Sequence, residues 1–156
     1  MSGRNSSASG NILVIGYGNT LRGDDAVGQH VALAVSDWSV PGLTALAVHQ
    51  LTSDLAEPLS TAQLAILVDA RLAAEGDFVE LHPLEPSTFV GLAAHASNPR
   101  GLLALALAVY GRHAPAWLVS VPAVDFSLRE GLSATATRGA EDALAQIAAL
   151  IGIKDR

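Results

Sequence analysis

Short apolar segments alternate along the chain with longer segments whose apolar residues recur at helical spacing. The apolar segments are rich in branched residues and have the length of buried strands, whereas the longer ones place apolar residues on one helical face. The expected strands cover residues 12–17, 43–51, 65–68, 77–82 and 117–121. The expected helices cover residues 26–37, a short segment from Thr52 or Ser53, residues 99–110, and a C-terminal segment from Ser133 to about residue 151. Strands that alternate with helices indicate an α/β fold.

The third and fourth expected strands are joined only by a short turn, "AAEGD". A parallel crossover needs about a dozen residues or more, so these two strands are predicted to be antiparallel neighbours. We therefore expect a three-layer α/β/α sandwich around a mixed, mostly parallel five-stranded sheet. Ligands of open α/β sheets bind beyond the carboxyl ends of the strands, so functional residues are expected after Tyr17, Val68 and Val121.

Composition narrows the class of protein. The chain has 156 residues, no cysteine and a net charge of −6. The length predicts a single domain over residues 11–156, after a flexible N-terminal tail of small and polar residues at positions 1–10. The absence of cysteine excludes disulfides and thiolate metal ligands, and the lack of Lys or Arg runs argues against nucleic-acid binding. No apolar run reaches the roughly 18 residues of a membrane span. We expect a cytoplasmic monomer that binds no membrane.

The segment "GYGNTLRGDD", residues 16–25, is the first candidate for chemistry because it leaves the first strand and ends in two adjacent acids. Its glycines suggest a dinucleotide fingerprint, but the third glycine of that motif would fall at Leu21. The end of the second strand, "LAVHQL", also lacks the acid that would bind a ribose. Gly16 and Gly18 are therefore interpreted as residues that permit a tight exit from the strand.

Asp24 and Asp25 admit two interpretations. Both acids favour the positive N-terminal end of the following helix, and one of them can cap it. Capping alone does not explain why the chain travels so far from the strand before the helix begins. We interpret Asp24 as the helix cap that also fixes the loop, and Asp25 as a side chain that could face the crevice at the strand ends.

Asp69 and His95 are the other two candidates. Asp69 directly follows the strand "AILV", where an unpaired carboxylate would be costly to bury, so it either accepts hydrogen bonds from turn amides or is functional. His95 lies in "GLAAHASNPRGLL", a loop of small residues before a helix, and is structural, exposed or functional. The histidines that compete with it for a functional role are His30, His49, His82 and His113.

Asp25, Asp69 and His95 come from separate loops and together form a set of nitrogen and oxygen donors. Such a set could hold a borderline divalent ion and leave positions for water or substrate. Neither the three-histidine nor the cysteine-rich zinc pattern is present. A Ser–His–acid hydrolase would need a G-x-S-x-G turn, which the chain lacks.

These segments resemble the nickel–iron hydrogenase maturation endopeptidases. "ILVIGYGNTLRGDDAVG" follows the family's opening pattern, roughly G-x-G-N-x-L-x-x-D-D/E-x-x-G. The matching residues are Gly16, Gly18, Asn19, Leu21, Asp24, Asp25 and Gly28. "LAILVDA" resembles the second block of the family, and "HASNPRGLLALALAVYG" resembles the third, a histidine followed by a helix rich in Leu and Ala. The resemblance covers the chain from residue 11 to about residue 151.

The resemblance implies a cytoplasmic endopeptidase that removes a C-terminal extension from the precursor of a hydrogenase large subunit after nickel insertion. The metal-contacting positions of the family match Asp25, Asp69 and His95, and these are the predicted catalytic and metal-contacting residues. We expect nickel to arrive in the substrate precursor rather than as a permanent cofactor of the protease. The alternative is a non-catalytic relative that binds the precursor or the metal.

Overall fold

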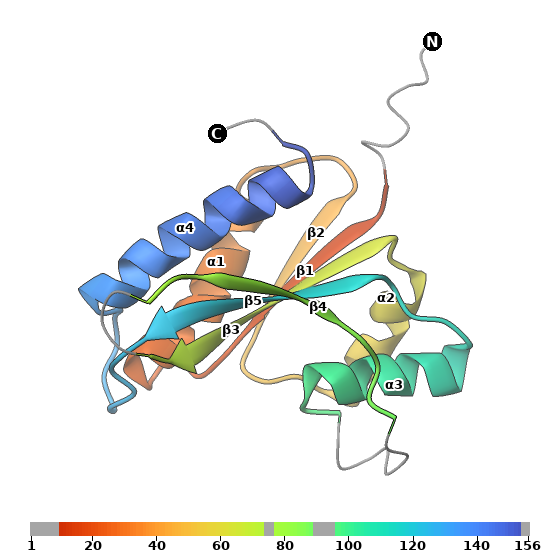
Figure 1. The fold of residues 1–156 in the computed structure, drawn as a ribbon, viewed down its shortest axis with the longest axis horizontal. Coiled ribbons are helices and arrows are strands. Elements are labelled where there is room, and N and C mark those ends of the chain that lie inside the picture. The colour runs from red at the N-terminus through yellow and green to blue at the C-terminus, as the bar shows by residue number, and fades with distance from the viewer. Residues whose placement is uncertain (1–9, 74–76, 89–95, 154–156) are drawn as a thin grey trace.

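The structure, a computed structural model, describes residues 10–73, 77–88 and 96–153 (Figure 1). The tail predicted at residues 1–10 lies outside these ranges except for Gly10, and so does His95. The elements are, in chain order, β1 (Ile12–Tyr17), η2 (Gly23–Ala26), α1 (Val27–Ser36), β2 (Leu43–Val48), η3 (Ser53–Leu55), α2 (Ala56–Thr61), β3 (Leu64–Leu72), β4 (Glu80–Leu84), α3 (Pro99–Tyr110), β5 (Ala116–Ala123) and α4 (Ala134–Leu150), where η marks a 3-10 helix. None of the helices in these ranges combines the length and the apolar composition that a membrane span needs.

The strands of the described ranges form one five-stranded sheet in the order β2-β1-β3-β5-β4. The first four strands in this order are parallel to one another, and β4 runs antiparallel to β5 at one edge. In Figure 1, α1 and α4 lie against one face of the sheet, and α2 and α3 lie against the other. The predicted three-layer sandwich around a mixed, mostly parallel sheet is thus confirmed.

One predicted pairing is wrong, because β5 lies between β3 and β4. β3 is paired with β1 on one side and with β5 on the other, so neither of its edges is open to β4. The chain instead leaves β3 across the end of β5, where the Ala73 N–H donates to the Ala123 carbonyl oxygen at 3.0 Å. β4 then adds to the far side of β5. The predicted antiparallel direction is right, since β4 opposes β5 and β5 runs parallel to β3.

Alternate residues of β1 show how the sheet is covered on both faces. Leu13 and Ile15 belong to the apolar cluster that includes residues of α2 and α3, while Val14 belongs to the cluster that includes residues of α1 and α4. None of the three is more than 3% exposed. A central parallel strand that is buried on both faces needs an uninterrupted apolar run, and the sequence of β1 supplies one.

Polar caps begin α3 and α4 where the sequence predicts them. α3 has the predicted bounds, Pro99–Tyr110. The Asn98 side chain accepts hydrogen bonds from two backbone N–H groups of the first turn, at 2.9 and 3.1 Å. Pro99 occupies the first helical position, where its missing N–H removes no helical hydrogen bond. The Ser133 hydroxyl accepts from a first-turn N–H at 3.1 Å, which confirms the predicted start of α4.

Replacing Asn98 by Ala is expected to lower the free energy of unfolding by about 1 kcal/mol, because two N–H groups at the start of α3 lose their acceptor. Asn98→Asp keeps an oxygen acceptor at the positive end of the helix and should stay close to the parent protein. Denaturant unfolding of the three proteins measures the difference. Equal losses in both variants would contradict the capping role of Asn98.

Candidate functional site

The candidate site lies at the carboxyl ends of β1 and β3. The pairing of β1 with β3 ends at Gly16 and Val68, so Asp69 is the first residue of β3 beyond that pairing. β3 itself continues to Leu72, which corrects the prediction that the strand ends before Asp69. The strand continues because β5 still pairs with it through Leu72. Asp69 therefore lies where β3 keeps one neighbouring strand and has lost the other.

The Asp69 carboxylate is half-buried and accepts a hydrogen bond from a phenol. The Tyr17 hydroxyl donates to Asp69 Oδ2 at 3.1 Å, and Tyr17 is only 9% exposed. Burial raises the pKa of the Asp69 carboxyl, and the negative charge of Asp25 adds to the rise; hydrogen bonds from Tyr17 and the Ala70 backbone oppose it without cancelling it. Burial raises the pKa of Tyr17, and the charge of Asp69 raises it further, so the phenol keeps its proton.

Asp25 lies in η2, the short helix before α1, and is also half-buried. Its Oδ2 accepts a hydrogen bond from the Asn19 N–H at 2.6 Å. Its charge contributes to the raised pKa of both Asp69 and Tyr17. A Cβ at Gly18 would lie 3.5 Å from the Asp25 carboxyl carbon, and Gly18 follows Tyr17, whose hydroxyl bonds Asp69, so both carboxylates lie where the chain leaves β1. Two acids from separate segments therefore lie at the same end of the sheet, as the strand-end argument predicts.

Asp24 does not cap α1, which corrects the sequence prediction. Neither η2 nor α1 has a side-chain hydrogen bond at its N-cap. The fully buried Asp24 carboxylate instead accepts hydrogen bonds from the N–H groups of Val124, Asp125 and Ser133, at 2.9, 3.1 and 2.7 Å, and from the Ser133 hydroxyl at 2.7 Å. The difference arises because the chain enters α1 through η2, which turns Asp24 toward the segment between β5 and α4.

The pKa of Asp24 reflects these contacts. Burial by itself would raise the pKa of the carboxyl, but the hydrogen bonds from Ser133, Val124 and Asp125 outweigh burial and lower it below its ordinary value. Asp24 is thus an ionised group that fastens the segment between β5 and α4 to the start of η2. The loop-fixing half of its predicted role is right, although the segment that it holds is a distant one.

The glycines of the first motif allow close packing rather than nucleotide binding. A Cβ at Gly16 would lie 1.8 Å from the carbonyl oxygen of Gly28, so β1 and α1 touch through their backbones. Gly18 has φ +150°, and a Cβ there would lie 1.8 Å from the Asp25 carbonyl oxygen. Only glycine fits such positions. Gly18, which follows β1, agrees with the interpretation as a tight exit from the strand, whereas Gly16 lies within β1 and instead allows close packing against α1.

The third predicted ligand, His95, lies outside the described residues, so its place in the site stays a prediction. Within residues 10–73, 77–88 and 96–153, no three His, Asp or Glu side chains are grouped so that they could hold a metal ion. Of the competing histidines, His82 contacts Glu80 Oε1 at 3.0 Å and His113 contacts the Ala114 carbonyl oxygen at 2.8 Å. The carboxylate pair is thus the described part of the predicted donor set.

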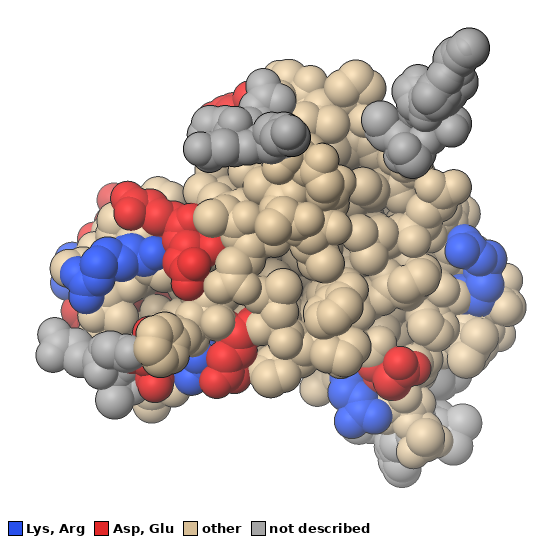
Figure 2. Space-filling model, turned by 45° about the horizontal axis from the view of Figure 1, so that its top comes forward, with Lys and Arg blue, Asp and Glu red and all other residues tan. Residues whose placement is uncertain are grey.

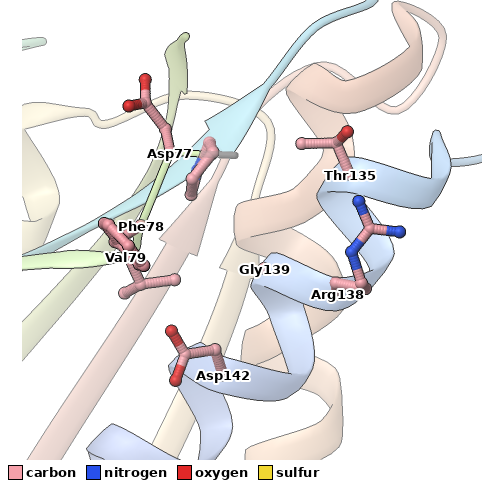
Figure 3. Close-up of a pocket in the computed structure, with 8 residues that line it drawn as sticks. Asp77, Phe78, Val79, Thr135, Arg138, Gly139 and Asp142 are labelled. Carbon is pink, nitrogen blue, oxygen red and sulfur yellow. The ribbon is translucent and has the colours of Figure 1, made fainter. Parts of the chain in front are cut away.

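A pocket of about 270 Å³ lies between α4 and the segment before β4 (Figure 3). Its lining includes Phe78, Thr135 and Arg138, together with two acids, Asp77 and Asp142. Neither Asp25 nor Asp69 lines this pocket. On the face shown in Figure 2, most charged side chains lie at the left and include both signs, further ones lie at the lower right and right, and the blue side chains form no extended basic surface.

Tyr17 and Gln29 support the site but were not singled out from the sequence. Gln29 of α1 donates from Nε2 to the Gly18 carbonyl oxygen at 2.8 Å, which ties the helix to the loop. A signal for Tyr17 was available, because it is a phenol at the end of an apolar strand and a buried phenol needs a hydrogen-bond partner. The acid at the end of the neighbouring strand, Asp69, is that partner.

Solved structures resemble this chain over nearly its full length. The NiFe hydrogenase maturation protease HycI from Thermococcus kodakarensis KOD1 is 23% identical, with a TM-score of 0.68 over 91% of this chain and 92% of that one. The hydrogenase maturating endopeptidase HybD from E. coli is 21% identical, with a TM-score of 0.69 over 91% and 92%. A hydrogenase 2 maturation peptidase from a Thaumarchaeota archaeon is 22% identical, with a TM-score of 0.67 over 92% and 99%.

The sequence itself matches no protein-family model and no curated protein. The likeness therefore rests on the three-dimensional arrangement, and at 21–23% identity it establishes the fold. Coverage of about nine-tenths or more of each chain means that the whole sandwich is shared rather than one motif. The chain has the fold of the NiFe hydrogenase maturation proteases.

Proposed function

We propose that this protein is an endopeptidase that removes the C-terminal extension from the precursor of a nickel–iron hydrogenase large subunit after nickel insertion. The observation that carries the proposal is the carboxylate pair, Asp25 and Asp69, at the carboxyl ends of β1 and β3 in a fold shared with hydrogenase maturation proteases. The order of the sequence blocks around these two acids and His95 gives independent support.

The chemistry of the pair suits a cation held by the substrate. Two nearby carboxylates repel each other, and burial adds to the cost of ionising Asp69. A divalent ion that approaches both acids removes this cost, and oxygen ligands with an imidazole are suited to a borderline metal such as nickel. In the proposal, nickel in the precursor contacts Asp25, Asp69 and His95. The precursor then binds in a productive position only when it carries the metal.

The residues also supply a reactive group. A carboxylate within reach of the attacking water can act as a general base, and Asp69 is the candidate. It would accept a proton from the water that attacks the scissile carbonyl and pass that proton to the amine nitrogen as the C–N bond breaks. The metal in the precursor could position this bond or polarise its carbonyl. The proposed division of roles is therefore recognition by both acids and proton transfer by Asp69.

The test is incubation of the purified protein with a hydrogenase large-subunit precursor, loaded with nickel or free of it. We expect mass spectrometry to show a shortened C-terminus for the nickel-loaded precursor and an intact C-terminus for the nickel-free one, because only the former offers the ion that the acids contact. An intact precursor that co-purifies with the protein in both cases would indicate the non-catalytic alternative. Equal cleavage of the nickel-loaded and the nickel-free precursor would contradict the proposed requirement for nickel.

A further inference from the structure

The last residue of β1 and the loop that follows it supply one hydrogen bond to each acid of the carboxylate pair. The Tyr17 hydroxyl donates to Asp69 Oδ2 at 3.1 Å, and the Asn19 N–H donates to Asp25 Oδ2 at 2.6 Å. Asn19 uses its backbone, so any residue type except proline could make that bond. Tyr17 uses its side chain, and the bond to Asp69 therefore depends on this residue being tyrosine.

The aromatic ring of Tyr17 is well fixed. Tyr17 ends β1, is 9% exposed and belongs to the apolar cluster that includes Leu51 and Leu55. Asp69 has less support, because the β1–β3 pairing stops one residue before it, at Gly16 and Val68. A rigid donor thus meets a carboxylate on the side where β3 has lost its neighbouring strand.

We infer that Tyr17 is a positioning residue that holds the Asp69 carboxylate in one orientation beside Asp25. Two nearby carboxylates repel each other and would turn apart if nothing held them. The phenol donor opposes this by bonding one oxygen of Asp69 from within the apolar cluster. Tyr17 does not touch the substrate in this role, which it performs through Asp69. The orientation of Asp69 by Tyr17 does not depend on the proposed function. The expected effect on precursor processing rests on it.

Tyr17→Phe tests this role, because it removes the hydroxyl and leaves the ring in place. Loss of a partner that orients a metal ligand typically lowers activity or metal affinity about 10–100-fold. We expect kcat/KM for the nickel-loaded precursor to fall by that factor, because Asp69 contributes both to recognition of the metal and to proton transfer in the proposal. Tyr110→Phe is the matched control, because Tyr110 is 49% exposed on α3. It should process the precursor at the parent rate.

A second measurement reads the geometry without any enzyme assay. Three-bond NMR couplings to the Asp69 carboxyl carbon report whether the side chain keeps one χ1 rotamer. We expect one rotamer in the parent protein and in Tyr110→Phe, and several in Tyr17→Phe. In mixed H₂O and D₂O, the parent protein should also show an isotope shift at the Asp69 carboxyl carbon from the bonded Tyr17 hydroxyl.

These readouts separate the two proposals. If the parent protein leaves every precursor intact, the proposed function fails, while the couplings still decide whether Tyr17 orients Asp69. If Asp69 keeps the same single rotamer in Tyr17→Phe, or samples several in the parent protein, the positioning role is overturned. If Tyr17→Phe does not fold, the isotope shift in the parent protein decides: its presence supports the hydrogen bond, and its absence refutes it.

Discussion

Replacing Asp24 by Ala is expected to lower the free energy of unfolding by about 3 kcal/mol and the melting temperature by about 10 °C. The buried carboxylate accepts four hydrogen bonds from three residues of the segment between β5 and α4. Alanine leaves three backbone N–H groups and the Ser133 hydroxyl without this acceptor, and hydrogen bonds to a charged group are among the stronger ones. Thermal and denaturant unfolding measure the loss.

Asp142→Ala is the matched control for Asp24→Ala. Asp142 is an exposed acid on α4 that accepts a hydrogen bond from Gln146 Nε2 at 3.3 Å. Exposed substitutions of this kind usually change stability by less than about 0.5 kcal/mol. Similar losses in the two variants would show that Asp24 contributes no more than a surface acid does.

The effect of Asp24 should also depend on pH in a definite direction. Its folded-state pKa is lowered, so the unfolded chain binds the proton more readily. The stabilisation is therefore present above the ordinary aspartate value of about 4 and is lost as pH falls through the folded-state pKa. We expect the difference between the parent protein and Asp24→Ala to be constant from about pH 7 to pH 5 and to shrink below about pH 4.

Asp24 illustrates which features of this fold are readable from the sequence. β1 and α3 have the predicted bounds because their signals are local: an apolar run for the strand, and Pro99 for the start of the helix. The partners of Asp24 lie 100–109 residues along the chain, so no local pattern contains them. A helix cap was the natural local interpretation of that acid, and tertiary structure overrides it.

The place of β4 was missed for a related reason. A short turn correctly predicts the direction of the next strand, but adjacency depends on which edges are still open. β5, which is later in the chain than β4, pairs with β3 and takes that edge. The strand order therefore depends on β5, which follows β4 in the chain and lies outside the local β3–β4 sequence.

Within the site, the two acids could be predicted and their supporting donors could not. Asp25 and Asp69 come after apolar strands of the expected parallel sheet, and the carboxyl ends of parallel strands lie at the same edge. The donor to Asp69 is the Tyr17 hydroxyl. The strand pattern places Tyr17 at the end of β1 but does not predict which residue its hydroxyl contacts. The loop between β1 and η2 is joined to the Asp25 carboxylate by a hydrogen bond from the Asn19 N–H.

The carboxylate pair leads to the second large expected effect: Asp69→Asn should reduce processing of a nickel-loaded precursor by about 10²–10⁴-fold, the usual range for loss of a general base. Asparagine has nearly the same shape, and its side-chain oxygen can still accept from the Tyr17 hydroxyl. The variant removes the charge and the basic oxygen but keeps the packing. The rate of C-terminal shortening by mass spectrometry is the measurement.

The same variant should be as stable as the parent protein or more stable near neutral pH. The folded-state pKa of Asp69 is raised, so the native protein binds this proton more readily than the unfolded chain. The native state is therefore favoured below the ordinary value of about 4, and this advantage is lost as pH rises through the folded-state pKa. Asparagine stays neutral, so the variant should gain relative to the parent protein as pH rises and match it near pH 3.

Activity and stability thus move in opposite directions at Asp69, as expected where a site keeps a charge that the fold disfavours. Asp37→Asn is the control, because it makes the same change at an exposed acid at the end of α1. It should alter neither quantity. An Asp69→Asn protein that processes the precursor at the parent rate would refute the catalytic assignment. One that is inactive but also clearly less stable would contradict the expected stability and indicate that the Asp69 carboxylate supports the fold.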